Sequence, residues 1–215
     1  MSLASEVWEL VRAGFSGIWV ETHEPSEAIL ELSSLGREQG LRILAWNLDA
    51  GMRTINGEEM VNESTDPLSA VRSLGTISGG QSTLLVLENF HRFIEGPEVC
   101  QAILTQLLIG KQQGRHVVVL APMVKLPQEL ERQFVVISHP LPDRAQLWEI
   151  AESLVDDPDL YPSAHREMQL DAAAGLTRME AESACRISDA EPEVAARHIG
   201  RTESHYACPL LPPPN

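Results

Sequence analysis

Five short apolar runs occur in the first two thirds of the chain, and helical patterns separate most of them. Apolar runs of about 4–8 residues in such an alternation indicate strands buried on both faces, as in a parallel sheet covered by helices. We therefore predict an α/β fold with a five-stranded parallel sheet, whose ligand chemistry lies at the carboxyl ends of the strands. The predicted strands are residues 17–20, 41–48, 82–90, 116–122 and 134–138.

Capping signals and apolar periodicity place helices between these strands. Ser26 is a predicted N-cap, and Asp66-Pro67 predicts a helix start with a cap followed by proline at the first helical position. The segment 49–65 contains glycines and acids, so it is predicted as an exposed loop or short hairpin. The predicted helices are a first one from residue 3 to a stop at Gly14, then residues 27–39, 66–77, 98–114 and a short helix at 126–133.

From Asp143 onward the sequence becomes helical and more acidic. Asp143 is a predicted cap, and Thr177 followed by Glu180 forms a capping box. The predicted helices here are residues 143–154, 164–174, 177–187 and 191–199, with Gly175 joining the second to the third. We predict an α/β domain over residues 1–142, a small helical lid subdomain over 143–200 and a flexible Pro-rich tail over 201–215.

Charge and cysteine content exclude several classes of function. The formal net charge of -15, with bases scattered along the chain, disfavours nucleic acid and anionic lipid as partners. No apolar run reaches the roughly 20 residues of a membrane span, and the N-terminus lacks the basic region and apolar core of a signal peptide. Cys100, Cys185 and Cys208 are too widely spaced for a metal knuckle or a disulfide framework. We expect a cytoplasmic protein without metal or cofactor.

Five strands in a βα alternation, followed by a small helical lid, resemble the P-loop-NTPase-like layout of an AAA-type nucleotide hydrolase. The phosphate cradle of that class needs a Gly-rich loop and a lysine directly after the first strand. Residues 21–27 occupy that place, contain neither glycine nor lysine, and carry three carboxylates that would repel a triphosphate. Lys125 follows the fourth strand and Lys111 lies inside a predicted helix, so neither lysine substitutes. The sequence therefore predicts that conventional phosphate-loop binding is absent.

The third strand ends in Glu88 and Asn89. A metal-and-water site there would need an aspartate for Mg²⁺ and a glutamate for the water, so one acid and one amide form a defective version. We interpret both as solvated strand-end residues and assign no catalytic residue. If a nucleotide binds at all, its candidate contacts are these two residues with Thr22, His23 and Ser26.

Four basic side chains are candidates for binding an anion or for an interface. His91 and Arg92 follow the third strand and could clamp an anion. The favoured interpretation is structural, in which they cap the next loop and pair with nearby acids. Lys125 and Arg144 complete the set.

Five short motifs stand in an order and at spacings that carry a family resemblance. They are Asp66-Pro67-Leu68, Leu87 with Phe90-His-Arg-Phe-Ile94, Ala121-Pro-Met-Val-Lys-Leu-Pro-Gln-Glu-Leu-Glu131, His139-Pro-Leu-Pro-Asp143-Arg144 and Gly175-Leu-Thr-Arg-Met-Glu-Ala-Glu182. Together they resemble the N-terminal half of the Ycf-type AAA-family ATPases of cyanobacteria, other bacteria and algal plastids, over residues 3–190. The resemblance implies an AAA-like domain without the phosphate loop, which in those proteins precedes a second AAA domain that binds and hydrolyses ATP.

The chain departs from the family pattern at three points. Asn89 stands where the family usually has an aspartate, and Ala121 replaces the small hydroxyl residue found where active AAA domains carry polar sensors. A second AAA domain does not follow in this sequence. The chain is therefore either a fragment or a truncated stand-alone relative.

Our main hypothesis is that this chain is not itself an enzyme. It would be a non-catalytic AAA-like module that acts through protein–protein contacts or ring assembly, with a protein partner or its own copies. The candidate surfaces are residues 21–26, 88–94 and 122–126 together with the acidic lid. The alternative is an unconventional Mg-ATP-binding ATPase that uses the turn at 21–26 and Glu88. A second alternative is a small-anion sensor that uses His91 and Arg92.

Overall fold

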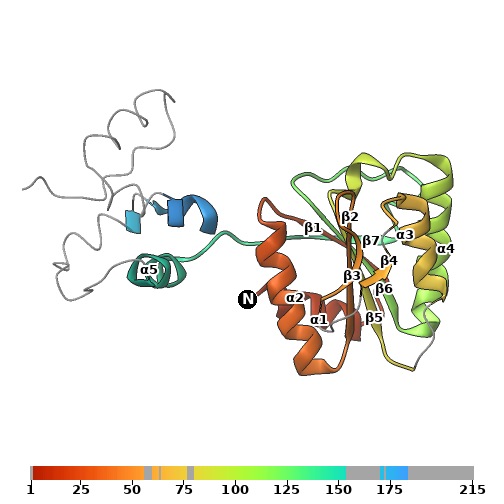
Figure 1. The fold of residues 1–215 in the computed structure, drawn as a ribbon, viewed down its shortest axis with the longest axis horizontal. Coiled ribbons are helices and arrows are strands. Elements are labelled where there is room, and N and C mark those ends of the chain that lie inside the picture. Colours follow the sequence, from red (N-terminus) through yellow and green to blue (C-terminus); the bar gives the residue numbers. More distant parts are fainter. Residues whose placement is uncertain are drawn as a thin grey trace, which may run out of the picture. The chain divides into compact units, whose positions relative to one another are not determined.

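The computed structural model describes residues 2–55, 60–62, 64–76, 80–153, 170–171 and 173–183. The chain divides into two compact units, Met1–Pro140 and Leu141–Asn215. The first unit holds the sheet, and the second holds the described helices that follow it (Figure 1). No helix among the described residues is long and apolar enough to cross a membrane.

The first unit is built on one seven-stranded sheet in the order β4-β3-β2-β5-β6-β1-β7 (Figure 1). Five neighbouring strands run parallel, which confirms the predicted five-stranded parallel core. These are β2 (Arg42–Asn47), β5 (Thr83–Glu88), β6 (Arg115–Ala121), β1 (Gly17–Glu21) and β7 (Phe134–Ser138). Antiparallel β3 (Gly51–Thr54) and β4 (Met60–Asn62) extend the sheet beyond β2. The segment 49–65 therefore contains a hairpin.

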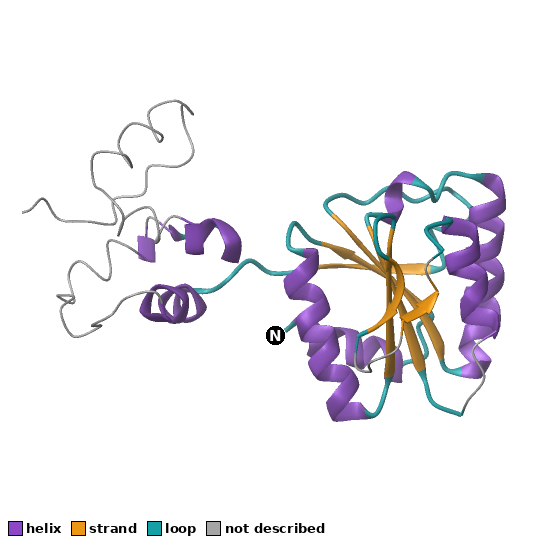
Figure 2. Cartoon of the chain, in the orientation of Figure 1, coloured by secondary structure: helices purple, strands orange, loops and turns teal. Residues whose placement is uncertain are grey.

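Two pairs of helices cover the two faces of this sheet (Figure 2). The helices α1 (Leu3–Arg12) and α2 (Pro25–Gln39) pack on one face, and α3 (Pro67–Thr76) and α4 (Pro97–Gln113) pack on the other. Strand residues alternate between the two cores, so Ile18 belongs to the α1/α2 side and Trp19 to the α3/α4 side. Each fully buried side chain of this size contributes about 1.5–3 kcal/mol. Burial on both faces explains why the strands appear in the sequence as unbroken apolar runs.

Local chemistry sets the helix starts, and one predicted cap is wrong. Asp66 Oδ2 accepts a hydrogen bond of 2.7 Å from the Ser69 amide, as predicted for the start of α3. Ser26 lies inside α2 rather than at its N-cap, because Pro25 occupies the first helical position. Proline suits that position, since its φ is already helical and its missing N–H would have no partner there.

The short helix predicted at residues 126–133 is also wrong. The chain makes two turns there instead, in which the Leu130 amide donates to the Pro127 carbonyl and the Gln133 amide donates to the Leu130 carbonyl. Both bonds span three residues, the spacing of tight turns rather than of an α-helix. Pro127 lies within the segment and has no amide to continue a helical ladder.

The second unit is described over α5 (Arg144–Ser153) and residues 170–171 and 173–183. Leu147, Ile150, Leu170 and Ala181 form its apolar cluster. Asp143 and Gln146 cap α5 reciprocally, and Thr177 and Glu180 form the predicted capping box. Most of the predicted helix at 164–174, all of the one at 191–199 and the predicted tail at 201–215 lie outside the described residues.

Candidate functional site

The carboxyl ends of the five parallel strands form one edge of the sheet, which we call the strand-end edge. The register pairs Glu21 of β1 with Ala121 of β6 and Ser138 of β7, while Glu88 of β5 lies opposite Leu120. Because β6 separates β1 from β5, Glu21 and Glu88 lie two strand spacings, or about 10 Å, apart. Such an edge is the usual place for ligands in open α/β sheets.

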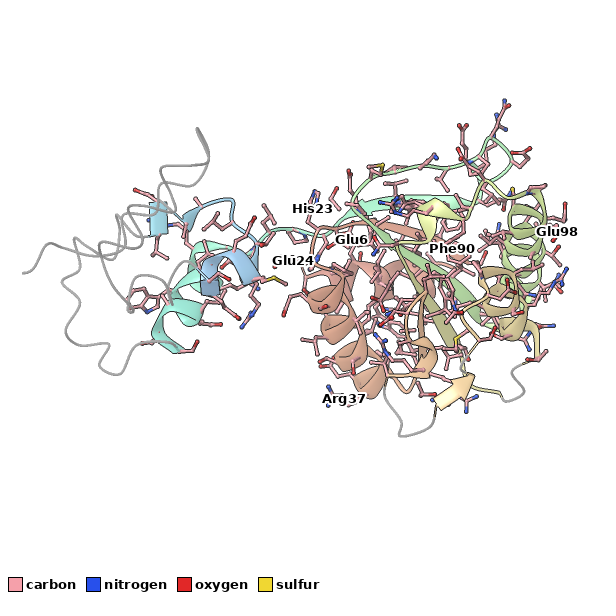
Figure 3. The ribbon with its side chains drawn as sticks, turned by 45° about the horizontal axis from the view of Figure 1, so that its top comes forward. Glu6, His23, Glu24, Arg37, Phe90 and Glu98 are labelled. Atoms are coloured by element: carbon pink, nitrogen blue, oxygen red, sulfur yellow. The ribbon has the colours of Figure 1, made fainter. Side chains whose placement is uncertain are left out.

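The turn after β1 is short and poor in amide donors. Only Thr22, His23 and Glu24 separate β1 from α2, and Figure 3 labels the last two of them. Pro25 at the first position of α2 has no N–H, and Glu24 at the N-cap makes no side-chain cap bond. A phosphate-binding loop needs several backbone N–H groups aimed at one point and a backbone that approaches closely. The turn after β1 offers fewer backbone N–H donors than a phosphate-binding loop, and the carboxylates of Glu21 and Glu24 lie beside those donors.

A hydrogen-bonded chain of three side chains ties this turn to its neighbours. Thr22 Oγ1 lies 2.8 Å from His139 Nδ1, and His139 Nε2 lies 3.2 Å from Glu31 Oε1 of α2. The Glu24 amide donates to Thr22 Oγ1 at 2.9 Å, and the Thr22 amide donates to the Ala121 carbonyl at 2.8 Å. Thr22 is only 4% exposed and the His139 side chain only 6%. The place that a phosphate cradle would need is therefore packed with the protein's own side chains.

The charge on Glu31 belongs to the same chain of contacts. The hydrogen bond with His139 lowers the pKa of Glu31 below its ordinary value, and burial acts against that shift to a smaller extent. The Ala4 amide of α1 adds a donor to Glu31 Oε2 at 3.3 Å. Glu31 therefore stays ionised at neutral pH and binds α1, α2 and the end of β7 together.

Glu88 is paired rather than solvated, which corrects our interpretation of it. Its Oε1 accepts hydrogen bonds from Arg53 Nη2 of β3 at 3.0 Å and from Asn47 Nδ2 of β2 at 3.2 Å. The Glu88 side chain is 13% exposed. The carboxylate thus bonds to the hairpin side of the sheet, away from the turn that follows β1.

Asn89 has a conformational role at the end of β5. Its φ of 54° and ψ of 25° lie in the left-handed region, which asparagine tolerates better than most residues. Its amide donates to the Leu120 carbonyl at 2.8 Å, and the short 3-10 helix η1 (Phe90–Arg92) begins directly after it. In Figure 3, Phe90 lies in the interior of the unit, whereas Glu98 lies at the surface. Asn89 therefore turns the chain so that Phe90 enters the core.

The basic candidates are only partly brought together. His91 is 6% exposed, its Nδ1 has no partner, and burial with Arg92 and Lys125 nearby lowers its pKa, so it is neutral at pH 7. Lys125 pairs with Glu95 at 2.9 Å. Arg144 belongs to the second unit, where it pairs with Asp171.

The polar contacts at this edge include four residues that the sequence did not mark as site candidates, although His139 stands in one of the family motifs. They are Glu31, Asn47, Arg53 and His139. Of these, only His139 carried a usable signal, because it directly follows a predicted strand whose end reaches the same edge. The described residues contain no group of three or more His, Cys, Asp or Glu side chains that could hold a metal ion.

The parallel strands β2, β5, β6, β1 and β7 with helices on both faces have the layout of an AAA-type fold. The family model for the SpoVK-like AAA ATPase N-terminal domain matches residues 3–139. Since that match spans more than half of the chain, the chain belongs to this family. The prediction of an N-terminal domain of an AAA-family ATPase is confirmed.

A solved structure supports the fold independently. A replication initiator DnaA bound to AMPPCP and single-stranded DNA matches with a TM-score of 0.54 and 13% sequence identity. The match covers 91% of this chain and 64% of that one, so the chain spans less than two thirds of the initiator's length. At this identity the likeness concerns the fold alone. No curated protein sequence gives a significant match.

Proposed function

We propose that this chain is a non-catalytic AAA-like module that acts through protein–protein contacts or ring assembly. The observation that carries the proposal is the packed turn after β1, where Thr22 and His139 are hydrogen-bonded to each other and Pro25 starts the helix without an N–H. Nucleotide would have to displace buried side chains that already satisfy one another. A domain of this fold that does not bind polyphosphate can still act through contacts of its surface with other proteins.

Exposed apolar side chains at the strand-end edge favour contact with a protein. Met123 is 52% exposed and Val124 is 44% exposed, and both lie in the loop after β6, which begins with Pro122. Leu48, which follows β2, is 55% exposed. Apolar side chains in loops near such an edge are typical of interaction sites rather than of phosphate sites.

We extend the proposal to the Ycf-type branch of the AAA ATPases, because the five ordered motifs resemble those of that branch. In that branch a second AAA domain would supply ATP hydrolysis. The reading frame downstream of the gene segment tests the assignment, because a Walker-type domain should follow in the same frame.

The proposal predicts that the chain does not bind Mg-ATP. Isothermal titration of Mg-ATP into the chain should give no heat beyond dilution. Millimolar Mg-ATP should leave the midpoint of thermal unfolding unchanged. If the chain did bind Mg-ATP, a concentration of about 1,000 times the Kd would stabilise the fold by roughly 4 kcal/mol and raise that midpoint. An intact AAA ATPase in the same buffer is the positive control. Micromolar affinity for this chain would overturn the proposal.

The competing hypothesis is an unconventional ATPase in which Glu88 acts with Mg²⁺, and it makes a different prediction. Because Glu88 is already held by Arg53 and Asn47, we expect no ATP-dependent phosphate release from the native chain or from Glu88→Gln. Glu95→Gln is the matched control, since it removes the same charge from the exposed pair with Lys125. Phosphate release that Glu88→Gln abolishes and Glu95→Gln preserves would favour the ATPase instead.

The small-anion sensor at His91 and Arg92 has one observation in its favour. His91 Nδ1 is buried without a partner, and two cations lie near enough to lower the pKa of the ring. However, a neutral imidazole adds no charge for an anion, and Lys125 already has Glu95. We therefore rank this function below the protein-contact module.

A further inference from the structure

A groove of about 630 Å³ lies between α3 and α4, and we call it the α3/α4 groove. The two helices pack side by side and run in the same direction, because each leads into one of the parallel strands β5 and β6 (Figure 1). Its walls are exposed at several side chains, so it is open to solvent along its length. The lining includes Leu68 and Arg72 of α3 and Glu98, Ala102, Thr105 and Gln106 of α4.

Gln106 lines this groove with a polar group that the fold leaves unsatisfied. The residue is 9% exposed, and its buried Oε1 has no hydrogen-bond partner. A buried acceptor without a partner costs free energy, and an apolar side chain of similar volume would fill the space without that cost. The terminal torsion of glutamine is broad, so the carboxamide can turn its carbonyl toward the groove. Gln106 is therefore suited to accept a hydrogen bond that a bound partner supplies.

Arg72 and Glu98 place opposite charges on opposite walls of the groove. Among the described residues, neither side chain makes an ion pair. Arg72 is close enough to Asp66 to act on its charge, but the Asp66 carboxylate already accepts the Ser69 amide that caps α3. Both charges are thus available to groups of opposite sign on a partner.

The contact between α3 and α4 fixes the order of these groups along the groove. A Cβ at Gly75 would lie 3.0 Å from Gln106 Nε2, so these two residues are level with each other. Because the helices run in the same direction, Arg72 lies roughly one turn above that level and Glu98 roughly one turn further on. An anion, a cation and an amide therefore follow one another at steps of about one helical turn.

We propose that the α3/α4 groove binds an amphipathic helix of another protein. That helix presents a basic side chain to Glu98, an acidic side chain about one turn away to Arg72, and a hydrogen-bond donor to Gln106. Its apolar side chains pack on Leu68 and Ala102 between these contacts. The inference rests on the proposed action through protein contacts, and it names a surface other than the strand-end edge.

The shape and charge of the groove favour a helix over other occupants. From Glu98 to Gln106 it follows α4 for about 12 Å, which matches one side of a short helix. An extended peptide would need backbone partners, and the N–H and C=O groups of α3 and α4 are used within those helices. A small molecule would stay largely uncovered in so open a groove. The net charge of -15 makes a second copy or a nucleic acid an unfavourable occupant.

A displayed library of short helical peptides, selected against the full chain, tests the charge pattern. Enriched peptides should carry Lys or Arg one turn from Asp or Glu. Arg72→Glu should weaken their binding by about tenfold or more in fluorescence anisotropy, and combining it with Glu98→Lys should restore binding to peptides with the two charges exchanged. Arg37→Glu is the matched control, since it makes the same charge change on exposed α2, which packs on the other face of the sheet (Figure 3).

Gln106→Leu separates binding from folding. Because Oε1 has no partner in the free chain, this variant should unfold at the same urea concentration as the native chain or at a higher one, and should still bind the enriched peptides more weakly. A library without binders would overturn the proposal, as would binders that neither Arg72→Glu nor Gln106→Leu weakens. Binders that Met123→Asp weakens and Arg72→Glu does not would overturn the groove while leaving the protein-contact function in place.

Discussion

Replacing Gly110 with alanine is expected to destabilise the first unit by about 2–3 kcal/mol. A Cβ at Gly110 would lie 2.2 Å from the Arg115 carbonyl oxygen and 3.4 Å from Ser16 Cβ. The first of these neighbours is backbone, so α4 or the start of β6 must move. Alanine improves helix propensity by only about 1 kcal/mol, which offsets part of the cost. Urea unfolding followed by tryptophan fluorescence measures the difference.

Gly80→Ala provides the control for this substitution. A Cβ at Gly80 meets nothing within 4 Å, so the same added methyl group should change the free energy of unfolding by less than about 0.5 kcal/mol. Equal stability of Gly110→Ala and the native chain would show that α4 can shift without cost, and would contradict the close packing of α4 on β6.

The role of Gly110 also decides how Gly110-Lys111 should be interpreted. A glycine followed by lysine is part of a phosphate-binding signature only in a loop between a strand and a helix. Here both residues lie within α4, which ends at Gln113. The glycine is needed because the helix approaches the backbone at Arg115, and the lysine lies in the last helical turn, where a cation is favourable. The sequence context alone allowed this conclusion, and the structure supplies its steric reason.

The parallel core could be predicted from the sequence because burial on both faces leaves a strong local signal. Runs such as residues 117–121 are apolar at every position and contribute to both cores, so no tertiary information is needed to recognise them. The hairpin of β3 and β4 was less certain, because its strands are short and its residues mixed. The helix predicted at 126–133 failed because its apolar spacing was satisfied by Leu126 and Leu130 packing onto the core through turns.

The partners at the strand-end edge could not be predicted, because they depend on contacts between distant segments. Thr22 and His139 are 117 positions apart, and Glu88 and Arg53 are 35 positions apart. Nothing in the neighbourhood of either residue indicates which distant side chain it will meet. The sequence did show that the turn after the first strand contains neither glycine nor lysine. This can be recognised without knowing which distant residues the turn contacts.

The second large effect is expected from His139→Ala, which should destabilise the first unit by about 1–3 kcal/mol. It removes His139 Nδ1 from the buried Thr22 hydroxyl, whose oxygen keeps the Glu24 amide, and it removes one of the polar contacts of Glu31. A buried polar group left without a partner costs about 1–3 kcal/mol. Ser34→Ala is the control, because Ser34 makes an exposed bond to the Leu30 carbonyl on the same helix and should cost far less.

A double-mutant cycle with Thr22→Val separates this network from simple loss of packing. Valine keeps the volume of threonine but removes the hydroxyl, so His139→Ala should cost less in the Thr22→Val background than in the native chain. Equal costs in both backgrounds would show that the 2.8 Å contact between Thr22 and His139 contributes nothing measurable.

The same network predicts how the cost of His139→Ala depends on pH. The hydrogen bond with His139 lowers the folded-state pKa of Glu31 below its ordinary value of 4.5. A group with a lowered folded pKa stabilises the protein fully above its unfolded pKa, and this contribution is lost as pH falls through the folded pKa. The stability difference between the native chain and His139→Ala should therefore shrink below pH 4.5 as Glu31 is protonated. If the difference in the free energy of unfolding between the two proteins stayed constant through that pH range, the contact with His139 would not lower the pKa of Glu31. The contact between His139 and Thr22 alone would then account for the cost of His139→Ala.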